Sequence, residues 1–244
     1  MNEKFKRGLI GAFDSVCHLL HRTSLYKYNT DLVELVADVR DSESNVFRGY
    51  YDIDHIDSSG TKLLIHKLKG TEKKEAVTIG YFDFLDRKII DLAETSAWCW
   101  QQGSRLRWFN DNNILFNDYN KGEYVAKVVD LEGTVIRRYS CALYDIDEAC
   151  TFGLSLNFTR LQRIRPGYGY SNESDKTKGV MDPLDDGIFR LSLITGDCEH
   201  IISYERLRAE VAPNVNGEAY INHISISPSG KFFLFFYIID DGRR

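Results

Sequence analysis

The 244-residue sequence lacks several features that would place it in a specialised class of protein. It has only four prolines and no low-complexity tract, which argues against long disordered linkers. No apolar run approaches the length of a membrane span, and Asp14 and His18 interrupt the first apolar stretch, so neither a transmembrane segment nor a clean signal peptide is predicted. We therefore expect a globular protein in the cytoplasm.

Cysteine pairs and an excess of positive charge are lacking as well. The five cysteines form no Cys-x-x-Cys pair, so neither a zinc knuckle nor a disulfide framework is predicted, and buried free thiols are expected. The formal net charge is -5, which leaves no basic field to attract a phosphate backbone. Nucleic acid is therefore not an expected partner.

What the sequence does contain is a repeated β-hairpin. Residues 51–65 (YDIDHIDSSGTKLLI) and 221–235 (INHISISPSGKFFLF) each indicate an alternating strand, a Ser-Gly turn and a second apolar strand. Two weaker copies occupy residues 104–116 and 143–156, and a second hairpin follows each of the first three copies. Four strands per unit, at a period of about 45 residues, is typical of a β-propeller blade.

The predicted fold is all-β, a partial β-propeller of four-stranded antiparallel blades over residues 31–244, with no helical stretch between the strands. Residues 1–30 are expected to form an N-terminal helix and lead-in. Apolar spacing predicts an amphipathic helix from Glu3 to Arg22, which would cap the propeller or, through its basic start, contact a membrane reversibly. Because the fourth repeat holds only half its strands, we expect about three and a half blades and a chain truncated from a longer propeller.

An insertion between residues 157 and 187 breaks the repeat. Its arginines and tyrosines are Arg160, Arg163, Arg165, Tyr168 and Tyr170. Guanidinium groups bind carboxylates bidentately and tyrosine rings stack on sugar rings, so this segment would suit an acidic sugar. The alternative is a solvated loop whose arginines pair with neighbouring acids.

Propeller topology brings further residues to one face. The segments that enter the innermost strands and those that leave the second strands both lie at the mouth of the central channel. The residues expected there are Tyr50, Tyr51, Gln101, Gln102, Arg105, Asn157, Asn222, His223 and His66. His55 lies in the middle of a predicted strand and is expected to be structural. We predict a ligand site at this mouth; the alternative is a polar channel that holds only water.

Five short strings resemble bacterial propeller proteins of the oligogalacturonate-lyase and TolB-like group. They are GYYD at 49–52, AWCWQQG at 97–103, SLNF at 155–158, RPGYGY at 165–170 and NHIS at 222–225. The resemblance extends from residue 49 to the end of the chain, and it is nearest to an uncharacterised branch associated with polysaccharide gene clusters. Members of the lyase branch have seven-bladed propellers, a manganese ion held mainly by histidines, and β-elimination activity on short uronate chains.

The resemblance implies roles for individual residues. β-Elimination needs a cation to neutralise the carboxylate and a base near the carbon that loses the proton. Arg105, Arg163 and His223 are the expected catalytic residues. His223 and His66 are the expected ligands of manganese or another divalent metal.

Two functional classes remain open. The first is a metal-assisted lyase or hydrolase acting on acidic oligosaccharides. The second is a non-catalytic propeller that binds a glycan or a protein partner in polysaccharide biosynthesis.

Overall fold

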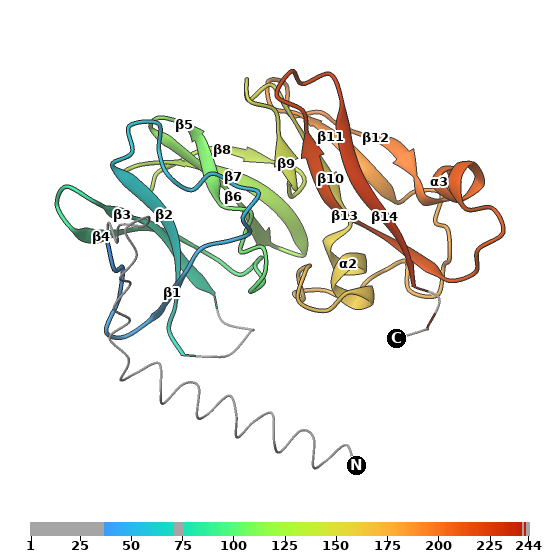
Figure 1. Cartoon of the computed structure of the whole chain (residues 1–244), viewed down its shortest axis with the longest axis horizontal. Coiled ribbons are helices and arrows are strands. Elements are labelled where there is room, and N and C mark those ends of the chain that lie inside the picture. Colours follow the sequence, from blue (N-terminus) through green and yellow to red (C-terminus); the bar gives the residue numbers. More distant parts are fainter. Residues whose placement is uncertain (1–36, 71–75, 241, 243–244) are drawn as a thin grey trace, which may run out of the picture. The chain divides into compact units, whose positions relative to one another are not determined.

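The computed structural model describes residues 37–70, 76–240 and 242 (Figure 1). Every described helix and strand lies within one compact unit, Val39–Arg244. The amphipathic helix expected from Glu3 to Arg22, and the domain boundary expected at residue 30, lie outside the described residues.

Three sheets have four strands each, and a fourth sheet has two. The first sheet contains β1 (Asn45–Phe47), β2 (Lys62–Leu68), β3 (Val77–Asp83) and β4 (Lys88–Thr95). The second contains β5 (Arg107–Asn110), β6 (Asn113–Asn120), β7 (Glu123–Asp130) and β8 (Val135–Tyr139). The third contains β9 (Asp145–Ile146), β10 (Phe152–Leu156), β11 (Gly187–Ser192) and β12 (Cys198–Ser203). The last contains β13 (Glu218–Ile226) and β14 (Phe233–Asp240).

Strands within each sheet follow one another in chain order, and every pair is antiparallel. In the first sheet, for example, Leu64 of β2 lies opposite Tyr81 of β3, which lies opposite Ile90 of β4. Neighbours in sequence are therefore neighbours in the sheet, as short hairpin connections require. The prediction of an all-β fold made of antiparallel sheets is confirmed.

Adjacent sheets share hydrophobic cores in chain order. Leu64 and Ile79 of the first sheet belong to one core with Phe116 of the second. Leu115, the neighbour of Phe116 on β6, instead packs in a core with Leu191 of the third sheet. The side chains of successive strand residues point to opposite faces, so β6 contributes to two cores at once.

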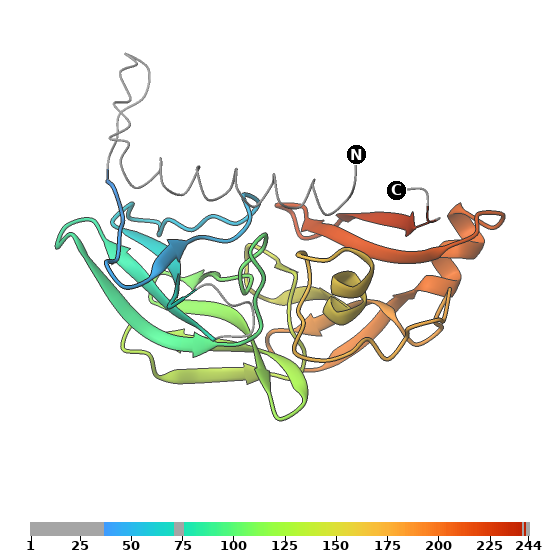
Figure 2. The ribbon, with the colours of Figure 1, turned by 90° about the horizontal axis from the view of Figure 1, so that it is seen from below.

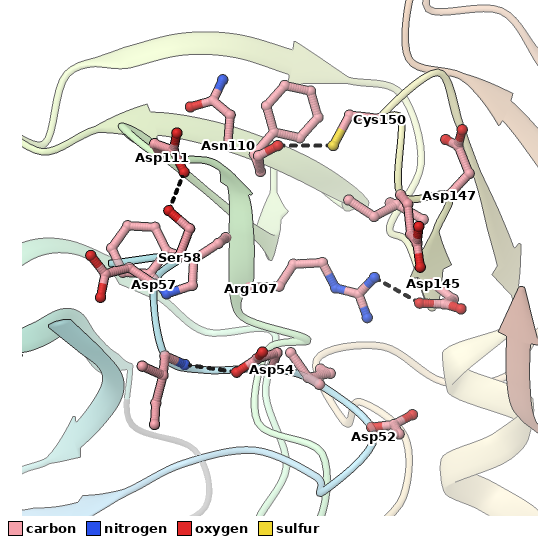
Figure 3. A pocket seen from close by; sticks show the side chains of 16 residues that line it. Asp52, Asp54, Asp57, Ser58, Arg107, Asn110, Asp111, Asp145, Asp147 and Cys150 are labelled. Carbon is pink, nitrogen blue, oxygen red and sulfur yellow. Dashed lines mark hydrogen bonds and ion pairs between the residues drawn. The ribbon is translucent and has the colours of Figure 1, made fainter. Parts of the chain in front are cut away.

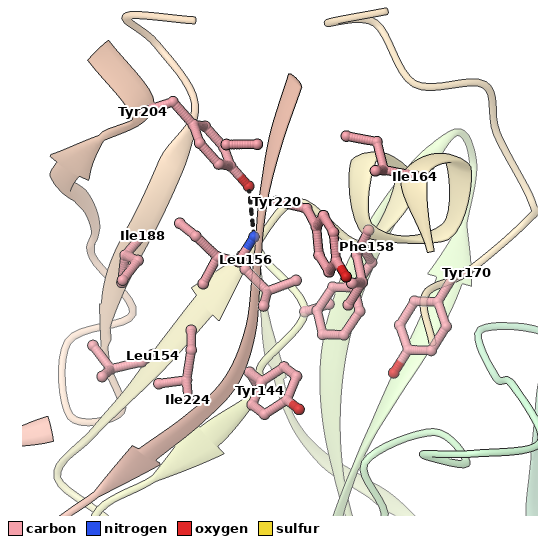
Figure 4. Packing of buried hydrophobic residues seen from close by; sticks show 14 of the residues in the cluster. Tyr144, Leu154, Leu156, Phe158, Ile164, Tyr170, Ile188, Tyr204, Tyr220 and Ile224 are labelled. Atoms are coloured by element: carbon pink, nitrogen blue, oxygen red, sulfur yellow. Dashed lines mark hydrogen bonds between the residues drawn. The ribbon is translucent and has the colours of Figure 1, made fainter. Parts of the chain in front are cut away.

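The largest core joins the third and last sheets. Figures 1 and 2 show β13 and β14 beside the third sheet, and Figure 4 shows the side chains between them. Leu154 and Ile188 of the third sheet pack in this core with Tyr220 and Ile224 of β13.

One turn geometry recurs at three hairpin tips and explains the Ser-Gly signature. The first residue of the turn accepts hydrogen bonds from backbone amides: Asp57 Oδ1 from Thr61 and Lys62 N, both at 2.7 Å, and Asp147 Oδ1 from Thr151 and Phe152 N, at 2.7 and 2.8 Å. Ser227 Oγ accepts one from Phe232 N at 3.2 Å. The fourth residues, Gly60, Cys150 and Gly230, have φ of 71°, 53° and 67°. A left-handed residue there favours glycine.

Two short helices interrupt the predicted series of strands. Helix α2 (Phe158–Ile164) lies in the insertion that the sequence suggested would be a loop, and Asn157 caps it by accepting from Thr159 and Arg160 N. Helix α3 (Tyr204–Val211) follows Ser203, whose hydroxyl accepts from Arg206 N. Each start uses a preferred N-cap residue. Within the described residues, no helix has the length and apolar character needed to cross a membrane.

The first hairpin also differs from its predicted form. The sequence places its first strand at residues 51–57, whereas β1 lies earlier, at Asn45–Phe47. Residues 51–53 turn, and pairing resumes only where Ile56 bridges Leu63 and Leu64 N donates to His55 O. Asp54 Oδ1 accepts a hydrogen bond from Ile56 N at 3.1 Å, a local contact that favours a turn over a strand.

Replacing the first residue of the recurrent turn should destabilise the fold. Asp57→Ala and Asp147→Ala should each lower the free energy of unfolding by about 1–2 kcal/mol, because each removes an acceptor of two backbone amides. Gly60→Ala should cost about 1 kcal/mol, because alanine is strained at the positive φ of this position. A steric clash adds nothing to this cost, since no atom lies within 4 Å of the added Cβ. Urea unfolding measures these changes. Glu148→Ala, which removes an exposed carboxylate from the same kind of turn, is the control, and equal stability of all four variants would contradict the assignment.

Candidate functional site

Polar side chains, all of them buried except that of Asp52, join the segments around the first strands of the four sheets. We call Asp52, Gln102, Arg105, Tyr144 and Asn222 the inner polar cluster. The Arg105 side chain is 1% exposed. Its Nε donates to Tyr144 O at 2.7 Å, its two terminal nitrogens donate to the Asp52 carboxylate at 3.1 and 3.0 Å, and its guanidinium lies 4.1 Å from the centre of the Tyr144 ring. One side chain thus connects segments of the first, second and third sheets.

The Tyr144 hydroxyl extends the inner polar cluster to the last sheet. It accepts hydrogen bonds from Gln102 Nε2 and His223 N, both at 3.1 Å, and donates to Asn222 Oδ1 at 3.0 Å. Gln102 Nε2 also lies 3.2 Å from Asn222 Oδ1. Arg105 and His223 both have positive φ, 55° and 52°, a conformation uncommon outside glycine. Such residues persist where their surroundings hold them firmly, and they gather at functional sites.

Aromatic rings lie next to this cluster. We call Tyr50, Tyr51, Arg165, Tyr168 and His223 the aromatic patch. The ring centres of Tyr50 and Tyr51 are 4.4 Å apart, those of Tyr50 and His223 are 5.4 Å apart, and those of Tyr168 and His223 are 6.5 Å apart. The Arg165 guanidinium lies 5.2 Å from the centre of the Tyr168 ring. Tyr51 is 77% exposed and Arg165 is also exposed, so the patch faces solvent.

Desolvation sets the charge states in the aromatic patch. It raises the pKa of Tyr50 to about 12, with a further contribution from its hydrogen bond to Tyr51, so the phenol stays protonated at neutral pH. Desolvation also lowers the pKa of His223; the nearby Asp52 carboxylate opposes this shift, and the Arg105 charge adds to it. His223 is therefore neutral at neutral pH.

The other arginines of the insertion are engaged by the protein. Arg160 is fully buried; it donates to the backbone carbonyls of Ala219, Val180 and Met181 at 2.7, 3.1 and 3.0 Å, and its guanidinium lies 4.6 Å from the Tyr204 ring centre. These contacts fix the insertion to β13.

Arg163 makes a comparable anchor through ion pairs. It donates to Asp175 at 2.8 Å and, bidentately, to Glu218 at 2.7 and 2.9 Å. Both pairs raise the pKa of Arg163 against the opposing effect of desolvation. The structure therefore places Arg163 with β13 and the insertion, and not with the aromatic patch.

Of the remaining predicted binding residues, two support helix α2 and one is exposed. Tyr170 is fully buried, its ring stacks on Phe158 at 4.4 Å, and its hydroxyl contacts Asn117 Nδ2 at 2.9 Å. Asn157 caps helix α2 and donates to Asp186 at 2.7 Å. Gln101 is exposed beside Gln102.

The two predicted metal ligands have different surroundings. His66 is fully buried in β2, where its Nε2 accepts from Ser104 N at 3.1 Å and lies 2.9 Å from Ser104 Oγ, and its ring stacks on Phe47. A Cβ on Gly103 would lie 2.5 Å from the His66 ring, so the glycine is required for this packing.

These surroundings do not fit a manganese ion. The rings of Tyr50, Tyr168 and Phe236 surround His223, and the nearby Asp52 carboxylate is bound by Arg105. Manganese prefers carboxylate, carbonyl and water ligands. Across residues 37–70, 76–240 and 242, no three His, Cys, Asp or Glu side chains are grouped to hold a metal ion.

A separate pocket of about 720 Å³ lies among the hairpin turns (Figure 3). Its lining is rich in carboxylates, but most of these have partners within the protein. Asp57 and Asp147 form the recurrent turns, Asp145 accepts from Arg107 and Ile226 N at 2.7 and 2.8 Å, and Asp111 accepts from Ser58 Oγ at 2.6 Å. These carboxylates hold hairpins together, so the aromatic patch remains the stronger candidate for ligand binding.

The sequence did not single out Tyr144 and Asp52, although both lie in segments expected at the channel mouth. Their roles depend on Arg105, which is 39 residues from Tyr144 and 53 residues from Asp52. No protein-family model matches the chain, and no curated protein matches it.

Replacing Arg105 should strongly destabilise the protein even when the charge is kept. Arg105→Lys should lower the free energy of unfolding by about 2–4 kcal/mol, because an ammonium group cannot bind Asp52 bidentately and also reach Tyr144 O. Arg206→Lys is the control, since Arg206 and Glu210 form an exposed pair at 2.8 Å on helix α3, and it should cost less than about 0.5 kcal/mol. Denaturant unfolding at neutral pH provides the measurement. Equal midpoints for the two variants would contradict this role of Arg105.

Acid should destabilise the protein through His55 and His66. Burial lowers their pKa from 6.5 to about 4 and about 3 when folded, so the unfolded chain binds protons that the folded chain does not. The stability that the two neutral histidines contribute is complete above pH 6.5. It is lost as the pH falls from 6.5 toward their pKa values in the folded protein. Between pH 7 and pH 5 the free energy of unfolding should fall by roughly 2 kcal/mol per histidine.

Urea unfolding at several pH values measures this dependence. The double variant His55→Gln, His66→Gln should be less stable at pH 7 but should lose most of the decrease between pH 7 and pH 5. An unchanged decrease would show that other groups cause the acid sensitivity.

Proposed function

We propose that the four sheets are consecutive blades of a β-propeller, and that this propeller binds an acidic oligosaccharide at the aromatic patch. Three features support the propeller arrangement: each sheet has its strands in chain order, adjacent sheets share cores, and segments around the first strands meet in the inner polar cluster. A propeller has the same features, since its blades pack face to face with their first strands around one axis.

The main support for sugar binding is the combination of tyrosine rings and the Arg165 guanidinium in the aromatic patch. Tyr51 and Tyr168 offer faces on which the apolar side of a sugar ring stacks, and Arg165 offers a fork that matches a uronate carboxylate. Arg165 is held over Tyr168 by a cation–π contact, which limits the conformational entropy lost on binding. The resemblance of residues 165–170 and 222–225 to the oligogalacturonate-lyase and TolB-like group supports a uronate as the ligand.

Binding without chemistry is the better supported class. Arg105 and Arg163, two of the three expected catalytic residues, already use their guanidinium groups in bidentate bonds to Asp52 and Glu218. Recruiting either of them to a substrate would leave a carboxylate without its cation, which carries a free-energy cost.

β-Elimination at the same patch is the second candidate, and His223 favours it. Because its pKa is lowered, His223 is an unprotonated imidazole at neutral pH and is able to accept a proton. It lies between Tyr50 and Tyr168, beside the residues that would orient the sugar.

Removing the ring or the guanidinium of the patch should weaken uronate binding. In calorimetric titrations with short oligogalacturonates, Tyr168→Ala and Arg165→Ala should each raise Kd about 10-fold, which corresponds to about 1.4 kcal/mol. Arg206→Ala, which removes an exposed arginine from helix α3, is the control and should leave Kd unchanged. Neutral oligosaccharides of the same length should bind more weakly, because they lack the carboxylate that Arg165 recognises.

Analysis of the products after incubation with oligogalacturonate separates binding alone from β-elimination. If the protein only binds, incubation with oligogalacturonate yields no unsaturated product, and His223→Gln leaves the substrate intact as the wild type does. If it eliminates, the wild type forms the unsaturated product and His223→Gln loses that activity. Equal binding of uronates by the wild type, Tyr168→Ala and Arg165→Ala would overturn the proposed site.

A further inference from the structure

Two cysteines that are far apart in sequence meet at the junction of two sheets. Cys141 follows β8, on the connection from the second sheet to the third, and Cys198 begins β12 of the third sheet. Their sulfur atoms are 3.2 Å apart. Cys198 is exposed and Cys141 is half-buried, so the pair is within reach of a reagent in solution.

The other described cysteines have different environments. Cys99 is buried. The thiol of Cys150 donates to Phe109 O at 2.8 Å, and burial raises its pKa. Neither therefore combines exposure with a neighbouring thiol in the way that Cys198 does.

The pair lies where a covalent bond would join two sheets. The nearby hydroxyl of Tyr139, on β8, donates to Leu193 O at 3.0 Å, and Arg137 donates to the same oxygen at 2.5 Å. Leu193 lies in the hairpin that connects β11 to β12. The thiols also line a pocket of about 510 Å³, which gives a small molecule access to them.

The two thiols are electrostatically unequal. The hydrogen bond between them lowers the pKa of Cys198 to about 7 and raises the pKa of Cys141. Cys198, the more exposed of the two thiols, therefore ionises more readily than Cys141. A nucleophilic thiolate beside a protonated thiol is the arrangement found in dithiols that exchange with disulfides.

We propose that Cys141 and Cys198 form a redox-active dithiol, which closes to a disulfide by exchange with a small-molecule disulfide and thereby links the second and third sheets. The Cys198 thiolate attacks one sulfur of the oxidant, breaking its S–S bond and releasing one thiolate. Cys141 then loses its proton to solvent and attacks Cys198 Sγ, forming the Cys141–Cys198 bond and releasing the second thiolate. The protein is oxidised by two electrons, and the small disulfide is reduced to two thiols.

Little movement is needed to close this bond. A disulfide places its sulfur atoms about 2.0 Å apart, so the two sulfurs need to approach by about 1 Å. The Tyr139 and Arg137 hydrogen bonds to Leu193 O already hold the β11–β12 hairpin against β8, which keeps the two cysteines close together.

Oxidised glutathione is a suitable probe, used on the full chain carrying Cys17→Ser in all variants. At pH 7 the protein should lose two free thiols, its mass should fall by that of two hydrogen atoms, and peptide mapping should recover Cys141 joined to Cys198. Cys141→Ser should stop at a glutathione adduct on Cys198. Cys150→Ala, the matched control, should still form the bridge.

Reactivity gives a second readout that does not depend on the bridge. In native protein at pH 7, iodoacetamide should alkylate Cys198 at least about 10-fold faster than Cys150, because Cys198 is exposed and its pKa is lowered, whereas burial raises the pKa of Cys150. The melting temperature of the oxidised form should exceed that of the reduced form, and this difference should vanish in Cys141→Ser.

Three results would overturn the proposal. They are separate glutathione adducts on both cysteines without a bridge, a bridge that includes Cys99 or Cys150, and equal alkylation rates for Cys198 and Cys150. None of these results depends on sugar binding, so the proposed function is tested independently.

Discussion

The buried guanidinium of Arg105 is the interaction on which the arrangement of the sheets depends. A charge that is 1% exposed is stable only when its donors are matched, and Arg105 is matched by Asp52 and by Tyr144 O, from two other sheets. The Tyr144 hydroxyl continues the network to Asn222. A shift of any one of these segments would leave a buried polar group unpaired, so their relative positions are narrowly set.

This constraint also positions the aromatic patch. The amide of His223 donates to the Tyr144 hydroxyl, which fixes the backbone that carries the imidazole, and the ring is enclosed by Tyr50, Tyr168 and Phe236. The exposed rings are therefore supported by a rigid shell of buried polar contacts, as a binding site that loses little entropy on binding requires.

Sequence reasoning found what is encoded locally and missed what is encoded at a distance. The hairpins were predictable because a turn such as that of Asp57 and Gly60 depends on a few neighbouring residues. Helix α2 was missed although Asn157 is a preferred cap and Phe158, Leu161 and Ile164 follow at helical spacing, because seven residues are too few for a clear periodic signal. The ion pair of Arg163 could not be predicted from the sequence. Its partner Glu218 is 55 residues away and becomes a neighbour only when the insertion packs on β13.

The two-sided burial of β6 affects how the molecule comes apart. In many repeat proteins each unit touches only its neighbours, and unfolding can proceed unit by unit from one end. Here Leu115 and Phe116, adjacent in one strand, belong to different cores. Withdrawing the second sheet would expose both cores together, so its loss is energetically coupled to that of the sheets on either side. A middle strand of this kind therefore couples the second sheet to both of its neighbours, because the second sheet cannot open without exposing apolar surface on two sides.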